Sequence, residues 1–426
     1  MPTDLLDMLR NDPSLAGQMM TADADLHDVD IQQLVFVRKL FFFRQLNSGD
    51  GPLSLVPFLK KKQRSTSFLE TLVLARDFES TDPRDKIFAV WNLAEDSAGL
   101  DFRTNYAKPV HEVYLDFTRA WIKQHRSLEI LGAVEASSDS QYFYEQASSW
   151  CPDWSKPARA SCLIRRDQIP ARSMASVDNL DAALYAADGS FGDVVAGDEP
   201  FSLVDNGIEC TGIILDTIDL ILDDPPDIPH DFAFPFGCDP ESYWQSHHWL
   251  TTLKQHFSEA DHAMYADVVQ AATAMFHGDC ASAWPPRAEN PEIVEDGREH
   301  EEYVCLPSLS RHIPKYGGSY SRAGAWHTLR SVLRGRVPFV TKEGYIGLCP
   351  SYIREEASEK PWSLAIVATC SVPLLLQERD DGSFRLCGTC FVQGWMEGGV
   401  LGTLFGLATP RDVWDAVGDG AKIRIT

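Results

Sequence analysis

The stretch FSLVDNGIECTGIILDTIDLIL, residues 201–222, carries the strongest short hairpin signal in the chain. Asn206 and Gly207 tolerate the positive φ angles that a tight turn between antiparallel strands requires. Residues that favour strands, among them several isoleucines, follow this turn. The stretch therefore predicts two strands joined at a turn of Asp205, Asn206 and Gly207.

The regions on either side of this hairpin differ in their expected secondary structure. From about residue 336 the sequence is strand-like, with the runs RVPFVT, GYIGLC, SLAIVATCSVPLLLQ and FRLCGTCFVQGW. Residues 1–135 instead indicate helices, one over 67–75 and the clearest over 107–131. Along the second helix an apolar stripe recurs with helical spacing, formed by Val110, Val113, Tyr114, Phe117, Ala120 and Trp121.

These patterns predict an α+β fold in which an N-terminal helical region packs with a C-terminal, mainly antiparallel β region. We expect a helical region over 1–135 and an α+β region over 136–426, the latter ending in a β-barrel-like or sheet module. Within the second region, residues 241–277 return to helical spacing, whereas 223–240 and 284–302 are typical of loops.

The composition is that of a globular, acidic protein. Of its 426 residues, 44% are hydrophobic and 23% are charged, and the net charge is −24. This charge argues against nucleic acid as a partner, because the neutralisation of phosphates needs clustered Lys and Arg. The basic run Lys60–Arg64 is interpreted as a solvated face, with a nuclear localisation signal as the alternative.

No segment has the features of a secretory signal or a membrane span. The N-terminus lacks a basic region followed by an apolar one. The most apolar segment, 31–46, is short and is interrupted by Arg38, Lys39 and Arg44. The ten scattered cysteines do not indicate a disulfide scaffold. We therefore expect a soluble, cytoplasmic protein that binds neither membranes nor nucleic acid.

The patterns that bind metals or cofactors are not found. Cys387 and Cys390 form the single CxxC pair, in a predicted strand where residues three apart point to opposite faces. Without a bulge they could not share an ion, so we interpret them as buried core residues. The histidines of 247–277 form no HExxH pair, and the sequence has no GxSxG, GxGxxG or GxxxxGK[ST] motif. No metal and no cofactor are therefore expected.

Cys151 is a candidate nucleophile between Trp150 and Pro152. A cysteine nucleophile needs a positioned base, which the sequence does not identify. Burial beside tryptophans would raise the pKa of the thiol and make it unreactive. We therefore favour a packing role for Cys151.

The stretch TDPRDKIFAVWNLA, residues 81–94, combines a turn signal, a charge cluster and an apolar segment. Thr81 or Asp82 can cap a helix, Pro83 suits its first position, and Asp85 lies where the helix dipole favours a carboxylate. The expected buried side of this helix is formed by Ile87, Val90 and Trp91.

Arg84 and Lys86 are not explained by capping, because cations are unfavourable in the first turn of a helix. We expect both side chains to contact another element, with Arg84 paired to a carboxylate there. Asp82, Arg84 and Asp85 are the alternative, catalytic interpretation of the same cluster.

Several segments resemble fungal heterokaryon-incompatibility (HET) domain proteins. DPRDKIFAVWNLA at 82–94 is similar to the DPRDKVYALLGLA-type segment of that family. NYAKPVHEVYLDFTRAWI at 105–122 resembles its DYSKSVEEVYTDFARYLI helix, and LEILGAV at 128–134 resembles the LDILS that follows. SSWCPDWS at 148–155 resembles LPSWVPDWS, with Cys151 in place of a valine.

Later segments follow in the family's order over roughly residues 65–400. RVPFVTKEGYIGLCP at 336–350 resembles RRFFRTEKGYIGLGP, and FRLCGTCFVQGWMEGG at 384–399 resembles YRLVGECYVHGIMDGE. Residues 207–221 resemble one of its strand pairs. The matching family-motif positions are Asp82, Pro83, Arg84, Asp85, Lys86, Trp150, Pro152, Asp153, Trp154, Gly344, Tyr345, Gly347 and Gly394.

The chain also departs from this family. The HET domain proper carries YxALSYVWG and WIDALCINQ segments, and neither occurs here. That half resembles Toll/interleukin-receptor domains, some of which bind or cleave NAD, so this chemistry is not carried over. The usual PGD turn is replaced by Ala357–Lys360. The resemblance thus implies the portion C-terminal to the HET domain: a truncated paralogue, a misjudged gene start or a part used alone.

The resemblance implies a regulatory or interaction protein, related to heterokaryon incompatibility or self/non-self recognition, without catalysis of its own. A protein partner is compatible with this, and the ligand, if any, is unknown. The alternative is a small-molecule-processing enzyme of a fungal secondary-metabolite pathway, with Cys151, Asp153, Asp82, Arg84 and Asp85 as its catalytic candidates. A third hypothesis is a partly folded remnant whose exposed segment 31–46 causes aggregation.

Overall fold

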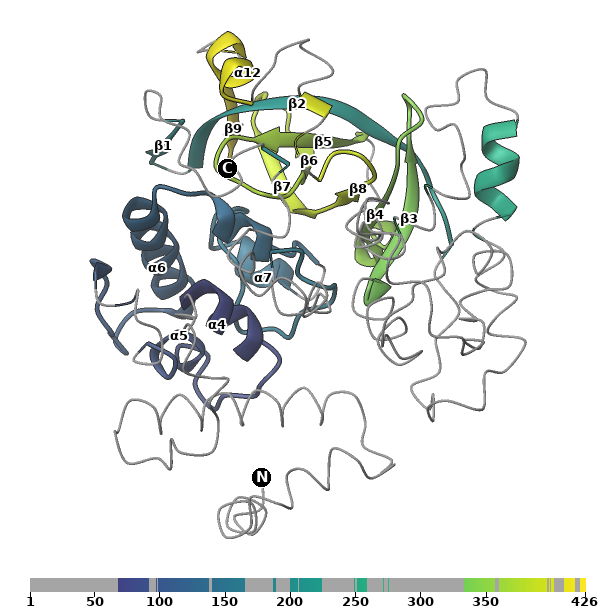
Figure 1. Ribbon diagram of the computed structural model, residues 1–426. Coiled ribbons are helices and arrows are strands. Elements are labelled where there is room, and N and C mark those ends of the chain that lie inside the picture. The colour runs from purple at the N-terminus through teal and green to yellow at the C-terminus, as the bar shows by residue number, and fades with distance from the viewer. Residues whose placement is uncertain are drawn as a thin grey trace, which may run out of the picture. The chain divides into compact units, whose positions relative to one another are not determined.

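Helices and one large, mostly antiparallel sheet make up the computed structural model of the protein (Figure 1), so the chain is an α+β protein. All described residues belong to one compact unit, formed by Pro52–Pro225 and Ser246–Thr426. The structure describes residues 68–91, 97, 99–137, 140–164, 187–188, 200–205, 207–223, 249, 251–258, 271, 275, 333–356, 360–396, 398, 400–401, 410–417 and 422–426.

Several predictions fall outside the described residues. These are the apolar segment 31–46, the basic run Lys60–Arg64, the loops 224–240 and 284–302, residues 357–359 of the replaced turn, and all histidines of 247–277 except His256. The domain boundary predicted at residues 135 and 136 stays a prediction. No helix among the described residues is long and apolar enough to cross a membrane.

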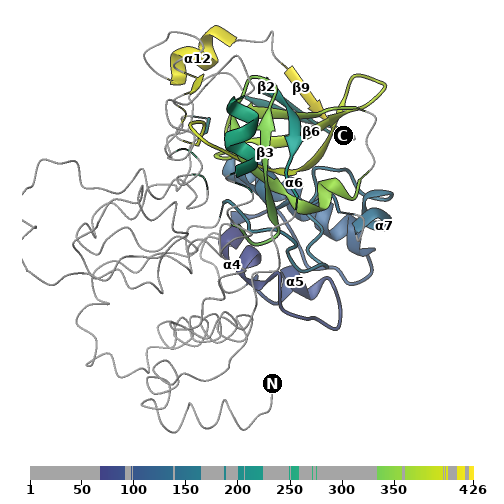
Figure 2. The ribbon, with the colours of Figure 1, turned by 90° about the vertical axis from the view of Figure 1, so that its right-hand side faces the viewer.

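The helices of the N-terminal half lie close together (Figures 1 and 2). The helical elements are α4 (Phe68–Ala75), α5 (Asp85–Phe88), α6 (Val110–His125), the 3-10 helix η4 (Glu129–Ala133), α7 (Gln141–Tyr144), the 3-10 helix η8 (Ser351–Arg354) and α12 (Pro410–Val417). Residues 251–258 are also helical, as the spacing in 241–277 predicts.

The longest helix, α6, forms where the apolar stripe predicts it. Pro109 precedes its first residue, and five of the six predicted stripe residues are buried, while Val110 is half-buried. The helix is shorter than the predicted 107–131 because Arg126 adopts a left-handed conformation with φ of 48°. The chain then continues into η4 instead of another α-helical turn.

The sheet contains nine described strands. They are β1 (Phe201–Val204), β2 (Gly207–Ile221), β3 (Arg336–Thr341), β4 (Ile346–Pro350), β5 (Trp362–Val367), β6 (Leu374–Glu378), β7 (Phe384–Thr389), β8 (Phe391–Val392) and β9 (Lys422–Ile425). β1 and β2 form the predicted hairpin, with Val204 opposite Gly207 at its turn. Each strand-like run predicted from residue 336 onward contains a strand or a strand pair.

β2 is the strand to which much of the sheet is attached. It pairs with β1, β3, β5 and β9, and its register shifts between Ile214 and Asp216 and again between Ile218 and Leu220. Such irregularities bend a strand. The pairings β2–β5, β5–β6, β6–β7, β7–β9 and β9–β2 form a closed circuit, in which only the short β7–β9 contact is parallel.

The sheet core explains the long apolar runs of the C-terminal half. Every residue of β3, β4 and β5 is buried, so both faces of these strands are covered. Leu364 and Ile366 on one face of β5 belong to a cluster with Phe339 and Trp395.

Hydrogen bonds join η4 to the loop between β5 and β6. The amide of Leu128 donates to the carbonyl of Thr369 at 3.0 Å. The carboxylate of Glu129 accepts the amide of Ser371 at 2.9 Å and also its hydroxyl. Thr369 itself has a positive φ of 67°, which is unusual for a β-branched residue. These bonds fix the segment that follows α6 against the strands.

Candidate functional site

The charge cluster at residues 82–86 begins with a local ion pair. The two carboxylate oxygens of Asp82 accept from the Arg84 guanidinium at 2.9 and 2.8 Å, and one of them also accepts the Arg84 amide at 3.0 Å. Asp82 therefore holds the turn that precedes α5. The helix itself begins at Asp85, with Arg84 at its N-cap position and no side-chain cap, so the prediction that Thr81 or Asp82 caps the helix is wrong. The hydrogen bonds from Arg84 hold the pKa of Asp82 below its usual value.

Arg84 contacts a second element through carbonyl groups. Its guanidinium donates to the carbonyls of Lys108, at 2.9 Å, and of Tyr106, and it lies over the Tyr106 ring. These residues belong to the loop before α6. The prediction that Arg84 pairs with a carboxylate of another element is wrong, because Asp82 lies close enough in the chain to form a bidentate pair. Asp85 accepts the hydroxyl of Tyr106.

Lys86 also contacts another element, as predicted. Its ammonium group is buried and donates to the carbonyl of Arg76 at 2.9 Å. Arg76 directly follows α4, so Lys86 ties α5 to the end of that helix. Burial lowers the pKa of Lys86, because the charged form loses its hydration.

Arg76 is a buried hub that the sequence analysis did not identify. Its guanidinium donates to the carbonyls of Ala133 at 2.7 Å, Lys156 at 3.0 Å and Asp153 at 3.1 Å. It also pairs with the Glu135 carboxylate at 3.3 Å. An arginine after an apolar helix is ordinary, and no local pattern marks it as buried. We call Arg76, Lys86, Glu135, Asp153 and Trp154 the Arg76 joint.

The WCPDW segment at 150–154 completes this joint. Trp150, Cys151, Asp153 and Trp154 are all almost fully buried. One carboxylate oxygen of Asp153 accepts the amide of Ser155 at 3.0 Å and also its hydroxyl. The Arg76 guanidinium lies 5.7 Å from the centre of the Trp154 ring. The structure thus brings Lys86 and Asp153, which lie in two separate segments of the sequence, to the same arginine.

Glu135 connects the Arg76 joint to the segment at Arg159 and Ala160. Its carboxylate accepts the amides of Ala160 at 2.8 Å and Arg159 at 3.0 Å, in addition to the ion pair with Arg76. On the other side, the hydroxyl of Tyr114 in α6 donates to the carbonyl of Pro83. The segments around residues 76, 83, 114, 135 and 153 are therefore linked by polar contacts.

Cys151 does not have the environment of a nucleophile. It is fully buried, and burial raises the pKa of its thiol to about 12. Its thiol contacts the hydroxyl of Thr118 at 3.7 Å and the carbonyl of Pro152 at 3.9 Å, and among the described residues no histidine contacts it. The packing role favoured from the sequence agrees with these contacts, and Cys151 is not supported as a catalytic candidate. Asp153 is likewise closed off from solvent.

The CxxC pair lies at a bulge, which corrects one expectation. Leu376 pairs with Leu386 and Leu375 with Gly388, so Cys387 is the extra residue. Cys387 and Cys390 consequently belong to the same core cluster instead of opposite faces. Burial raises the pKa of each thiol to about 12. No group of three metal-ligating side chains is found in the described part of the chain.

The C-terminal motif residues have backbone and packing roles. Gly344 and Gly394 adopt φ angles of 88° and 86°, which glycine reaches without strain. At Gly347, an added Cβ would lie 2.3 Å from the carbonyl oxygen of Phe391 in β8. Tyr345 packs edge-on against Trp395 with ring centres 5.1 Å apart. These residues shape the β3–β4 hairpin and its contact with β8.

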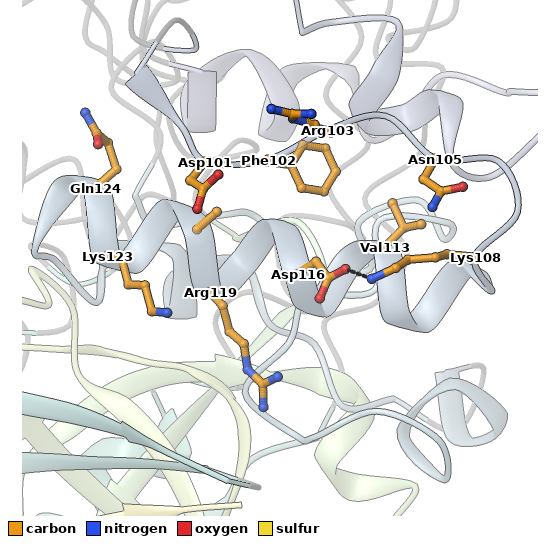
Figure 3. A pocket seen from close by; sticks show the side chains of 11 residues that line it. Asp101, Phe102, Arg103, Asn105, Lys108, Val113, Asp116, Arg119, Lys123 and Gln124 are labelled. Atoms are coloured by element: carbon orange, nitrogen blue, oxygen red, sulfur yellow. Dashed lines mark hydrogen bonds and ion pairs between the residues drawn. The ribbon is translucent and has the colours of Figure 1, made fainter.

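A groove lies between α6 and the loop that precedes it (Figure 3). We call it the α6 groove; its volume is about 460 Å³, and Phe102, Val113 and Ala120 contribute its apolar lining. Asp82, Arg84, Asp85, Cys151 and Asp153, the predicted catalytic residues, do not line it. The groove residues were not identified from the sequence, because loop 101–108 and α6 face each other only in the fold.

Comparison of the chain with protein-family models, with curated proteins and with solved structures finds no match in any of the three.

Proposed function

We propose that the chain is a HET-like fungal regulatory or interaction protein, related to heterokaryon incompatibility or self/non-self recognition, that lacks catalysis of its own. One observation carries the proposal: the motif residues that define the resemblance are used for internal contacts. Asp82 and Arg84 bind each other and the loop before α6, while Lys86 and Asp153 bind Arg76. The side chains of Asp82, Arg84 and Lys86 are thus used in the scaffold, and Asp153, which contacts Arg76 through its backbone carbonyl, has a buried side chain that accepts from Ser155.

The proposal includes a finer view of the architecture. A helical region over 1–135 packs with the mainly antiparallel β region of 136–426, and the Arg76 joint contributes to that packing. The protein acts in the cytoplasm through a protein partner. Neither nucleic acid nor a membrane is its target, which agrees with the net charge of −24.

The second candidate function is a small-molecule-processing enzyme of secondary metabolism. The α6 groove is the observation that favours it, since its volume of about 460 Å³ is in the range of ligand sites. Because the original candidates lie elsewhere, such an enzyme would have to use groove residues. Cys151 would have no part in its chemistry.

Gene deletion in the source organism, expected to be a filamentous fungus, separates the two functions. We expect that cell fusion of the deletion strain with incompatible partners has a different outcome from that of the parent. The metabolite profile should stay that of the parent. Complementation with Cys151→Ser should restore the parental behaviour, because the thiol only fills space.

An accumulated metabolite with unchanged fusion would contradict the regulatory proposal. Failure of a folded Cys151→Ser protein to remove that metabolite would instead assign catalysis to the cysteine. Folding of the variant is checked by its thermal melting curve beside that of the parent.

A further inference from the structure

Two cysteines lie opposite each other where β4 meets β8. Leu348 pairs with Phe391 in an antiparallel register. The next residue along β4 is Cys349, and the residue that directly precedes β8 is Cys390. The same register, continued by one position, therefore places these two cysteines opposite each other.

The hydrogen bonds between the two segments show which kind of cross-strand pair the cysteines form. The amide of Gln393 donates to the carbonyl of Ile346 at 2.9 Å, so these two residues form a hydrogen-bonded pair. Hydrogen-bonded and non-hydrogen-bonded pairs alternate along an antiparallel ladder, which makes Cys349 and Cys390 a non-hydrogen-bonded pair. The amide of Cys390 accordingly donates elsewhere, to the carbonyl of Pro373 at 3.0 Å.

This kind of pair has the spacing of a disulfide. The Cα atoms of a non-hydrogen-bonded pair are about 4.5 Å apart, and a disulfide joins residues whose Cα atoms are about 4.4–6.8 Å apart. The side chains of such a pair also extend to the same face of the sheet, where their Cβ atoms approach each other closely. Cys349 and Cys390 can therefore be bridged without a large movement of the backbone.

Both thiols belong to the same part of the core. Val337 lies opposite Cys349 in the register of β3 and β4, and these two residues share a core cluster with Cys390. Both cysteines are fully buried. Burial raises the pKa of Cys349 well above its ordinary value, and the charge of Cys390 raises it further, which agrees with neighbouring thiols.

Cys387 lies in the same cluster but is less well placed for a bond to Cys390. Residues three apart along an extended chain are separated by about 10 Å, which is beyond the reach of a disulfide. The thiol of Cys387 contacts the carbonyl of Arg385 in its own strand at 3.5 Å. The cross-strand pair is therefore favoured over the CxxC pair.

β8 offers a route by which a small molecule reaches the buried pair. This strand is two residues long, and among the described strands it pairs only with β4. Short segments with few hydrogen bonds open locally without unfolding of the whole protein. Opening at β8 exposes the thiols, and closing brings them together again.

We propose that Cys349 and Cys390 form a reversible disulfide when the protein meets a hydroperoxide. With hydrogen peroxide, the sulfur of one cysteine attacks an oxygen, the O–O bond breaks, a sulfenic acid forms and one water leaves. The second thiol then attacks the sulfur of the sulfenic acid, the S–S bond forms and a second water leaves. Two thiols are thus oxidised while one peroxide is reduced to two waters, and a thiol reductant reverses the bond.

The disulfide ties β4 to the segment between β7 and β8. It closes a loop of about 40 residues, and such a crosslink stabilises a fold mainly by restricting the unfolded chain. The redox state of the pair therefore sets the stability of this part of the sheet. The inference does not depend on the proposed function or on the family resemblance.

Peptide mapping of the full chain after incubation with hydrogen peroxide tests the site. Free thiols are blocked under denaturing conditions, and the digest is analysed by mass spectrometry without reduction. We expect a cross-linked peptide pair that contains Cys349 and Cys390 and that dithiothreitol separates. The oxidised chain should melt about 5 °C or more above the reduced chain, because the crosslink restricts the unfolded state.

Cys210→Ala is the matched control for Cys390→Ala. Cys210 is also fully buried, and the residues opposite it in the sheet are Phe201 and Ile423 instead of a cysteine. Cys390→Ala should abolish both the crosslink and the rise in melting temperature on oxidation, whereas Cys210→Ala should keep both.

Three results would overturn the proposal. These are an oxidised parent chain in which Cys349 and Cys390 remain unlinked, a crosslink between Cys387 and Cys390 instead, and a rise in melting temperature that Cys390→Ala retains. The first two come from the parent chain, so they decide the question even where a variant does not fold.

Discussion

Arg76 shows how one side chain can join segments that are far apart in the sequence. Its guanidinium is buried and donates to three carbonyls from residues 133–156, besides the ion pair with Glu135. Burying a charge is unfavourable unless it is paired and hydrogen-bonded, and here both conditions are met. The anionic groups around it, Glu135 foremost, offset the effect of burial and raise the pKa of Arg76.

The sequence could predict some residue roles and not others, depending on how local their cause is. Asp82 accepts the amide of Arg84, two residues away, and the tendency of aspartate to make such a local turn contact can be read from its residue type. Arg76 acts through carbonyls at least 57 residues away, which no local pattern encodes. For Lys86, the sequence predicted that its side chain contacts another element. It did not predict that the acceptor is the carbonyl of Arg76.

Cys151 should be unreactive in the native protein. Its pKa of about 12, against an ordinary value of 9.0, lowers the thiolate fraction at neutral pH by about a thousandfold. Alkylation by iodoacetamide at pH 8, followed by peptide mapping, should label Cys151 only after unfolding in urea. The half-buried Cys162 is the internal comparison and should react first.

The same thiol makes stability depend on alkaline pH. Because the unfolded chain ionises first, Cys151 contributes stability below pH 9.0 that is lost as the pH rises toward about 12. Rapid labelling of native Cys151 at pH 8 would contradict the buried environment and would reopen its catalytic role.

At the scale of elements, the sequence predicted the helices and hairpins that depend on neighbouring residues. The β1–β2 hairpin forms with Val204 opposite Gly207, and α6 buries five of the six stripe residues. The bulge at Cys387 could not be predicted, because it arises from the pairing of β7 with β6. The bonds between η4 and the β5–β6 loop also depend on residues that lie about 240 positions apart.

Gly347 and Gly394 are expected to tolerate alanine differently. At Gly347 the added methyl group would meet the Phe391 carbonyl oxygen at 2.3 Å, where two strands approach each other. At Gly394 no atom lies within 4 Å of it, and only the φ of 86° opposes the change. We expect Gly347→Ala to lose about 1–3 kcal/mol of unfolding free energy from overpacking, and Gly394→Ala about 1 kcal/mol from backbone strain.

Urea unfolding followed by circular dichroism measures both variants. The informative result is which of the two variants loses more unfolding free energy. If Gly347→Ala were as stable as the parent, the close approach of β4 and β8 would be refuted. A larger loss in Gly394→Ala than in Gly347→Ala would show that backbone strain at Gly394 costs more than overpacking between β4 and β8.

At the scale of the whole molecule, the charge cluster of residues 82–86, for which catalysis was the alternative, and the α6 groove are formed by different residues. Residues 82–86 and 150–154 both contact Arg76: Lys86 donates to its carbonyl, and its guanidinium donates to the carbonyl of Asp153. The α6 groove is lined by other residues, one of which, Lys108, accepts a hydrogen bond from Arg84 through its carbonyl. If this division is correct, changes in the joint should alter stability, and changes in the groove should leave it unchanged.

The most direct test of the structural role of the motif is the unfolding free energy of Arg76→Gln, measured in urea beside that of Arg103→Gln. Arg76→Gln leaves Glu135 buried without its ion pair, so we predict a loss of about 3–5 kcal/mol. Arg103→Gln changes an exposed groove residue and should stay within about 0.5 kcal/mol of the parent. Equal stability of Arg76→Gln and the parent would contradict the structural joint.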